Sequence, residues 1–240
     1  MVNDAVTSAG APPSAEAARR AECAERALAL GYAPGGARPA IDALFALDEV
    51  LGQILRTGRE PLISQMRLTW WHDALTRLDT APPPAEPILQ ALFDDVLPRG
   101  VSGAALATMV EGWEALLDPG PREAEGRALF GDRRGGDLFR AAGAVLGARG
   151  NPPLALAGSG WALADLARHL ADRAAAEAAL AEARAILARI SPHRWGREVR
   201  ALGALSRLAL RDTAVPLDRP IPSGSPGRVG RLLWHRLTGY

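Results

Sequence analysis

The stretch REPLISQMRLTWWHDAL (residues 59–75) carries two adjacent tryptophans in a chain that is only 5% aromatic. Pro61 suits the first turn of a helix, and the apolar residues after it recur at helical spacing. They fall into two stripes. One consists of Ile63, Met66, Trp70 and Ala74, and the other of Leu68, Trp71, Leu75 and Leu78. Adjacent helical residues point about 100° apart, so the two stripes face different neighbours. The segment predicts a helix over 61–78 that is buried between neighbours on two sides.

Helical spacing of apolar residues continues along the chain, and the alternating pattern of strands is absent. Helices are expected at about residues 14–31, 39–57, 61–78, 86–97, 103–117, 122–130, 136–148, 153–173, 175–190, 197–211 and 227–239. Glycine and proline separate them, as Gly135–Gly136 is expected to do between two of these helices. The pattern predicts an all-α helical bundle in a single domain.

Four segments are expected along the chain. They are a disordered N-terminus at 1–13, a helical domain at 14–211, a proline-rich linker at 212–226, and a short basic amphipathic helix at 227–240. The first segment consists mostly of small and polar residues and ends in two prolines. The linker is rich in proline, serine and glycine.

The composition excludes several classes of function. The formal net charge of the 240 residues is +1, which gives no overall drive toward nucleic acid. All 28 basic residues are arginine, so Schiff-base chemistry on lysine is excluded. A single cysteine allows no intrachain disulfide. The chain start lacks a signal-peptide pattern, and no run of about 18 apolar residues exists. A cytoplasmic protein is therefore expected.

Two segments carry a resemblance to a known family. ALFALDEVLGQIL (residues 43–55) and REPLISQMRLTWWHDAL resemble two helices of the squalene/phytoene synthase family, the second being its Arg-x-x-Trp helix. Within the family, the second segment is most similar to a subgroup related to a respiratory complex I assembly factor, in which Glu-Pro precedes the tryptophans as Glu60–Pro61 does here. Weaker similarity continues through GGDLFRAAGAVLG (135–147) and GWALADLARHLADR (160–173).

The resemblance implies an isoprenoid-synthase-like helical bundle with a central cavity. Enzymes of this family join two isoprenoid diphosphates head to head. Two aspartate-rich motifs face each other across their cavity and hold Mg²⁺, which binds the diphosphate. Hard dications of this kind prefer oxygen ligands, and the charge that develops on the departing diphosphate must be neutralised.

Both aspartate-rich motifs are degraded in this chain. Alignment with the family places the aspartates of the first motif at Gly52 and Arg56, neither of which is acidic. The second motif, Arg-Asp-x-x-Glu-Asp in the family, reads Arg168-His169-x-x-Asp172-Arg173 here. The joint loss predicts a protein without catalysis, so no catalytic residue and no metal ligand are assigned.

Eight residues are candidates for a ligand pocket: Asp48, Arg67, Trp70, Trp71, Asp165, Arg168, His169 and Asp172. Asp48 is either a relic ligand or a helix-flank carboxylate paired with Arg56 or Arg67. The four residues between 165 and 172 form either an anion site or a solvent-exposed face with pairs at i,i+3 and i,i+4. The tryptophans either pack or close the mouth of the cavity. Arg67 matches the arginine of the family helix and would address an anionic group.

Two functions follow from these patterns. The first is a non-catalytic family protein that binds an apolar, isoprenoid-like molecule or a protein partner, such as a subunit of a membrane complex during assembly, and needs no cofactor. The alternative is a Mg²⁺-dependent prenyltransferase of the phytoene/squalene synthase type, with ligands such as Asp48, Asp165 and Asp172.

The C-terminal segment PGRVGRLLWHRLTGY (residues 226–240) leaves two interpretations open. Val229, Leu232, Leu233 and Leu237 share one apolar face with Trp234 at its border, and arginines flank that face. A short basic amphipathic helix of this kind either caps the bundle or makes weak peripheral contact with a membrane at its cytoplasmic face.

Overall fold

The computed structural model describes residues 15–58, 60–117 and 120–240. The N-terminal segment 1–13, for which disorder was expected, lies outside this range. All regular structure in the described residues is helical, which confirms the all-α class. The α-helices are α1 (Ala15–Leu30), α2 (Arg38–Thr57), α3 (Pro61–Arg77), α4 (Pro87–Ala91), α5 (Gly103–Glu114), α6 (Ala124–Phe130), α7 (Asp137–Val145), α8 (Leu154–His169), α9 (Arg173–Ile190), α10 (Arg200–Asp212) and α11 (Pro226–Thr238). The short turns of 3₁₀ or π geometry are η1 (Gly35–Ala37), η2 (Leu92–Val96), η3 (Leu97–Arg99), η4 (Gly120–Arg122), η5 (Gly131–Gly136) and η6 (Arg197–Val199).

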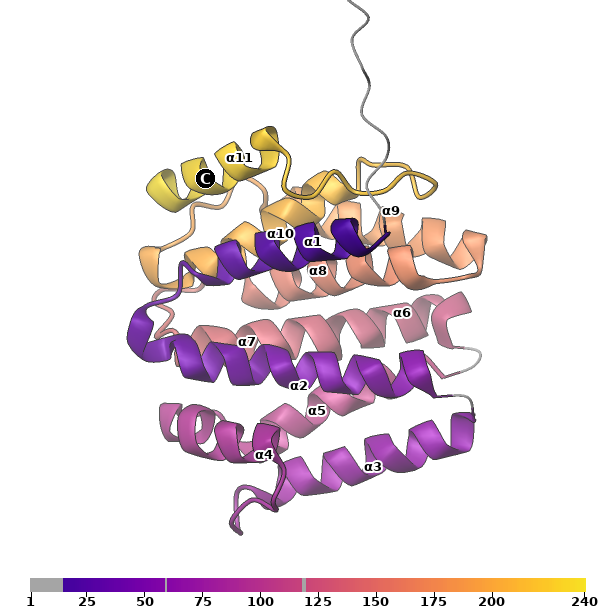
Figure 1. Cartoon of the computed structure of the whole chain (residues 1–240), viewed down its shortest axis with the longest axis vertical. Helices are drawn as coiled ribbons and strands as arrows, with labels where there is room; N and C mark the ends of the chain where they lie inside the picture. The colour runs from indigo at the N-terminus through magenta and orange to yellow at the C-terminus, as the bar shows by residue number, and fades with distance from the viewer. Residues whose placement is uncertain (1–14, 59, 118–119) are drawn as a thin grey trace, which may run out of the picture.

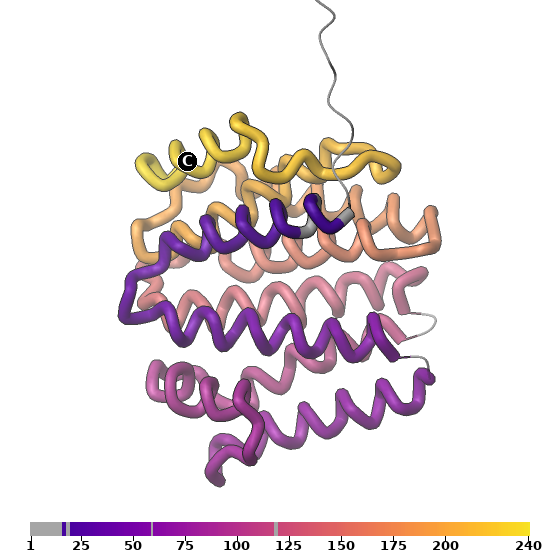
Figure 2. Tube along the Cα trace, viewed as in Figure 1, coloured from indigo at the N-terminus to yellow at the C-terminus, as the bar shows by residue number. Residues whose placement is uncertain are grey.

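The long helices stack along the longest axis of the molecule, with α3 at one end and α11 at the other (Figure 1). Helices from the two halves of the sequence lie beside one another, since α1 contacts α10 and α2 contacts α7. The path of the chain through this stack can be followed in Figure 2. This interleaving produces one continuous hydrophobic core.

Helix α2 lies inside the stack because its apolar residues cover a broad arc. Pro39 occupies the first turn, where its missing N–H leaves no hydrogen bond unmade. Ile41, Leu44 and Leu51 are fully buried. Neighbours on several sides, namely α3, α4, α5 and α7, cover this arc. The placement carries Asp48, on the same helix, into the core.

Helix α3 is buried on one side only, which corrects the prediction made from its two stripes. The Trp71 stripe is buried, and Trp71 itself is 5% exposed. The Trp70 stripe faces outward, with Ile63, Met66 and Trp70 about half exposed or more. Because α3 lies at the end of the stack and packs mainly on α5, no other helix of the described residues covers its second face (Figure 1).

Helices α6 and α7 are joined without a break, although Gly135–Gly136 was expected to separate them. The π turn η5 continues the helix from one into the other. A Cβ atom on Gly135 would stand 2.0 Å from the carbonyl oxygen of Gly158 in α8, and one on Gly158 would stand 1.9 Å from that of Gly135. The glycine therefore permits close contact between two helices rather than a turn.

Replacing Gly135 with alanine is expected to destabilise the protein by about 1–3 kcal/mol or more, because a backbone carbonyl cannot move aside as a side chain can. The matched control is Gly230→Ala in α11, where a Cβ atom meets nothing within 4 Å. That change is expected to stabilise the helix by about 0.5–1 kcal/mol. Chemical denaturation compares the two variants, and equal effects would contradict the packing role of Gly135.

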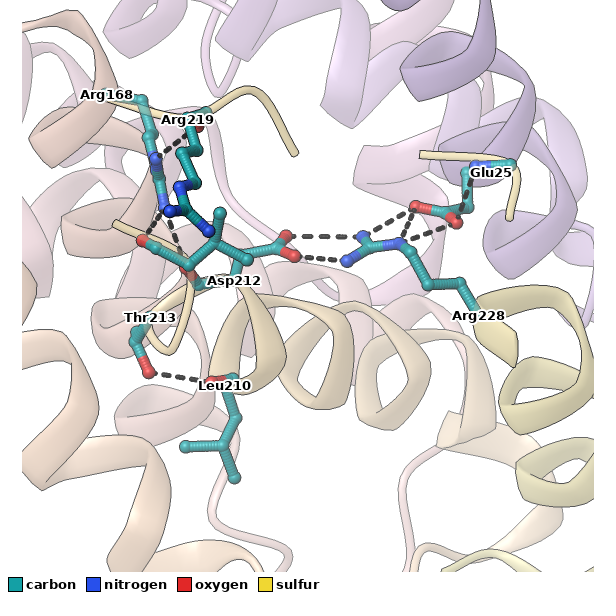
Figure 3. Close-up of polar contacts among 9 residues, drawn as sticks. Glu25, Arg168, Leu210, Asp212, Thr213, Arg219 and Arg228 are labelled. Carbon is teal, nitrogen blue, oxygen red and sulfur yellow. Dashed lines mark hydrogen bonds and ion pairs between the residues drawn. The ribbon is translucent and has the colours of Figure 1, made fainter. Parts of the chain in front are cut away.

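Helix α11 is held against the bundle by buried polar contacts. The guanidinium of Arg228 donates to Glu25 of α1, at 2.9 Å from Nε to Oε1 and 2.7 Å from Nη2 to Oε2, and it also binds Asp212 of α10 (Figure 3). Leu232 and His235 are 1% exposed. The inner face of α11 therefore packs as a cap. Within the described residues, no helix combines the length and apolar character needed to cross a membrane.

Candidate functional site

An ion cluster lies at the centre of the bundle, where three helical elements meet. Asp48 of α2 and Asp165 of α8 face each other across the guanidinium of Arg134 from η5. Arg134 donates to both oxygens of Asp48, at 2.8 Å from Nε and 3.0 Å from Nη2, and to Asp165 Oδ2 at 2.5 Å from Nη1. The side chains of Arg134 and Asp48 are 5% and 2% exposed. One arginine thus pairs with carboxylates from two helices.

Aromatic rings enclose the same guanidinium. The Cζ atom of Arg134 lies 4.4 Å from the ring centre of Trp113, 4.8 Å from that of Trp161 and 5.2 Å from that of Phe130. Cation–π attraction of this kind is strongest where water is excluded. Arg134 and the rings of Trp113, Phe130 and Trp161 are therefore packed together at this point of the bundle.

The pKa values of Arg134 and Asp165 reflect their pairing. Burial lowers the pKa of the Arg134 guanidinium, but Asp48 and Asp165 outweigh that effect, so the pKa lies above its ordinary value. Burial likewise raises the pKa of Asp165, but Arg134 and then His169 outweigh it, so the pKa of this carboxyl lies below its ordinary value. A paired charge at the centre is stable only while both signs are present.

The tryptophan helix does not reach this cluster. Arg67 is exposed on α3 and forms no ion pair within the described residues. Trp70 is 49% exposed and meets Trp71 edge to face, with ring centres 5.3 Å apart. The structure therefore does not bring these three candidates together with Asp48 and Asp165.

A comparison with protein families finds a match over part of the chain. Residues 20–129, from α1 into α6, match the squalene/phytoene synthase family. The match includes Asp48 and the tryptophan helix, whereas Arg134 and Asp165 follow it in the chain. Neither the curated proteins nor the solved structures compared with this chain include a significant match.

Gly52 and Arg56, the positions at which the resemblance leads us to expect the first aspartate-rich motif, lie inside this matched segment. At Gly52, where the alignment places an aspartate, a Cβ atom would stand 2.8 Å from the Trp113 ring. The ring that stacks on Arg134 therefore takes the room of a side chain at that position. At the second position, Arg56 pairs with Glu49 at 2.5 Å and remains partly exposed. One interpretation of the sequence paired Asp48 with Arg56 or Arg67. In the structure Asp48 pairs with Arg134 instead.

The residues aligned with the second squalene/phytoene synthase motif are dispersed. Asp172 caps α9 by accepting from the Ala175 N–H at 3.1 Å, and it pairs with Arg122 at 3.2 Å. These contacts, the backbone bond first, hold the pKa of Asp172 below its ordinary value. His169 is exposed and its Nδ1 donates to the backbone oxygen of Asp165 at 2.8 Å. Of the four candidates between residues 165 and 172, only Asp165 reaches the central cluster.

Arg168 has a structural role that the sequence did not suggest. Its guanidinium donates to four backbone oxygens at the end of α10 and beyond, which are those of Asp212, Val215, Pro216 and Arg219 (Figure 3). These contacts tie the segment between α10 and α11 to α8. Arg168 therefore orders the chain before α11 rather than binding an anion.

The Mg²⁺ that squalene/phytoene synthase enzymes use does not fit the residues present here. Both oxygens of Asp48 and one of Asp165 accept hydrogen bonds from Arg134. Among the described residues, no three histidine, cysteine, aspartate or glutamate side chains lie close enough to hold a metal ion. The guanidinium supplies the positive charge that a cation would bring between these helices.

Proposed function

We propose that this protein is a non-catalytic member of the squalene/phytoene synthase family that binds a protein partner and uses no cofactor. The observation that carries the proposal is the bridge from the buried Arg134 to the buried Asp48 and to Asp165, whose side chain is 30% exposed. An enzyme of this type needs carboxylates that are free to bind Mg²⁺ and a cavity for its substrates. Here the carboxylates are paired and the rings of Trp113, Phe130 and Trp161 fill the space around the pair.

The alternative, a Mg²⁺-dependent prenyltransferase, would need other ligands. The three carboxylates available for that role are Asp48, Asp165 and Asp172. The first two bind Arg134, and the third caps α9 and pairs with Arg122. Moving Arg134 away would leave Asp48 buried without a counter-charge, which is costly. The geometry therefore favours the non-catalytic function.

A protein partner is favoured over a small apolar ligand by the surface of α3. Leu62, Ile63, Met66 and Trp70, defined here as the α3 outer face, are between 49% and 68% exposed. Leu62, Met66 and Trp70 repeat every four residues, which is the spacing of anchors on a helix that docks into an apolar groove. We infer a partner that presents such a groove. The similarity of Glu60–Pro61 to the assembly-factor subgroup supports a subunit of a membrane complex as that partner.

Incubation with farnesyl or geranylgeranyl diphosphate and Mg²⁺ is expected to release no diphosphate above the level of a heat-denatured sample. Calorimetry is likewise expected to show no Mg²⁺ site of micromolar affinity, since the carboxylates are engaged by Arg134. A phytoene synthase serves as the positive control for the assay. Diphosphate release that Asp48→Asn or Asp165→Asn abolishes would overturn the proposal and establish the enzyme.

A further inference from the structure

The arginines of this protein are distributed very unevenly along the chain. Residues 184–240 carry eleven arginines and three carboxylates, hence a formal charge of +8. The preceding 183 residues carry 17 arginines and 24 carboxylates, hence −7. A net charge near zero therefore conceals one strongly basic segment. The fold places this segment in and around α9, α10 and α11, at one end of the molecule (Figure 1).

The basic end has two hollows lined largely by arginine. One, of about 270 Å³, is lined by Arg184, Arg207, Arg211 and Arg231 together with Leu210 of α10 and the two residues that follow this helix, Thr213 and Ala214. The other, of about 320 Å³, is lined by Arg194, Arg197 and Arg200 with Trp195 and Gly196. Arg231 belongs to α11, so the first hollow lies beside that helix. Arg200 Nη1 donates to the backbone oxygen of Arg236, so the second lies near the end of the same helix.

The arginines that line the two hollows are not paired with carboxylates of the described residues. Within the described part of the chain, none of the seven that line the hollows forms an ion pair with a carboxylate. Arg200 and Arg207 are instead fixed by donating to backbone oxygens. By contrast, Arg127, Arg134 and Arg228 each bind a carboxylate at 3 Å or less. The two hollows thus present positive charge that no carboxylate within the described residues pairs with.

Helix α11 adds a large apolar surface between the hollows. Its inner side, Arg228, Leu232 and His235, is buried against the bundle. Its outer side exposes Leu233, Trp234 and Leu237 at 47%, 55% and 76%. The apolar face expected from the sequence is therefore split, since Leu232 packs inward and Leu233 and Leu237 point outward. Arg231 and Arg236 lie on the two flanks of the outer side.

We propose that this end of the molecule binds the surface of an anionic phospholipid membrane. Leu233, Trp234 and Leu237, defined here as the α11 outer face, enter the interface between headgroups and acyl chains, and the arginines beside them bind headgroup phosphates. A nucleic acid also attracts arginine, but it offers no apolar layer for two leucines and a tryptophan that lie together. Because α11 is already docked through Arg228 and His235, no helix has to form on binding.

The test is co-sedimentation of the full chain with vesicles of phosphatidylcholine alone and of equal parts phosphatidylcholine and phosphatidylglycerol. Binding is expected only with the anionic vesicles, and it should weaken steeply with added salt. Replacing two arginines, Arg197→Gln and Arg231→Gln, is expected to lower the partition coefficient by about 30-fold, because each contributes about a fivefold gain near an anionic surface. Trp234→Ser is expected to lower it as well.

The control is the pair Arg67→Gln and Arg77→Gln on α3, which removes the same charge from exposed residues at the opposite end. This pair is expected to keep at least half of the binding. Equal losses in the two pairs, or no binding by the unchanged chain, would overturn the proposal. The proposal would also be overturned if the protein bound a single-stranded RNA that displaced it fully from vesicles, and if Trp234→Ser left this RNA binding unchanged. Circular dichroism verifies that every variant remains folded.

Discussion

Replacing Arg134 with methionine is expected to lower the free energy of unfolding by about 3–5 kcal/mol. The change removes the only cation that contacts Asp48 within the described residues and leaves that carboxylate 2% exposed without a partner. It also removes the positive charge stacked on Trp113 and Trp161. Denaturation by urea, followed by circular dichroism, measures the loss. A change smaller than about 1 kcal/mol would contradict the central position of Arg134.

Two further variants separate charge from side-chain volume. Arg133→Met, one residue earlier, removes partly exposed contacts at 3.2 Å to Glu111 and 3.6 Å to Asp137, so a loss of about 1 kcal/mol or less is expected. Combining Arg134→Met with Asp48→Leu is expected to recover most of the stability, because an apolar pair can replace a buried ion pair without loss. Failure of this rescue would mean that the Arg134 side chain acts through its shape rather than its charge.

Replacing Trp71 with alanine is expected to cost about 3–5 kcal/mol, the range for a large aromatic residue removed from a core. Trp71 is 5% exposed and shares its buried stripe with Leu68 and Leu75. Trp70→Ala, on the neighbouring residue, is expected to cost about 1 kcal/mol or less, since it loses mainly the edge contact with Trp71. The same denaturation measurement compares them.

Equal losses in the two tryptophan variants would contradict the one-sided burial of α3. The expected difference also has a practical use, because Trp70→Ala remains folded. It is therefore the variant in which a partner that binds the α3 outer face should be lost while the stability of the bundle is retained.

Helix positions could be predicted closely from the sequence because they depend on local patterns. The start of α3 at Pro61 and of α11 at Pro226 follows from proline in the first turn. The continuity of α6 and α7 could not be predicted, because the role of Gly135 depends on Gly158, which is near in space but not in sequence. Likewise, periodicity reveals that α3 has two apolar stripes, but not that only one has a neighbour.

Two residues of the central cluster, Asp48 and Asp165, are among the ligand-pocket candidates chosen from the sequence. Asp48 and Asp165 could be chosen as candidates because each lies on a helix that the family resemblance points to. Arg134 was missed because its partner Asp48 lies 86 residues earlier, so no local spacing links them. One signal was present: Arg134 stands among closely spaced glycines and one helical turn after Phe130. Small residues around a long side chain mark a helix whose neighbours come close.

The α3 outer face and the α11 outer face lie at opposite ends of the longest axis of the molecule (Figure 1). Two bodies docked at these ends do not compete for space, so one copy of the chain suffices to join them. The helices between the ends form one packed core rather than two lobes with a hinge. If α11 binds a membrane, a partner protein bound to α3 would therefore be kept at a fixed distance from the membrane surface and in a fixed orientation.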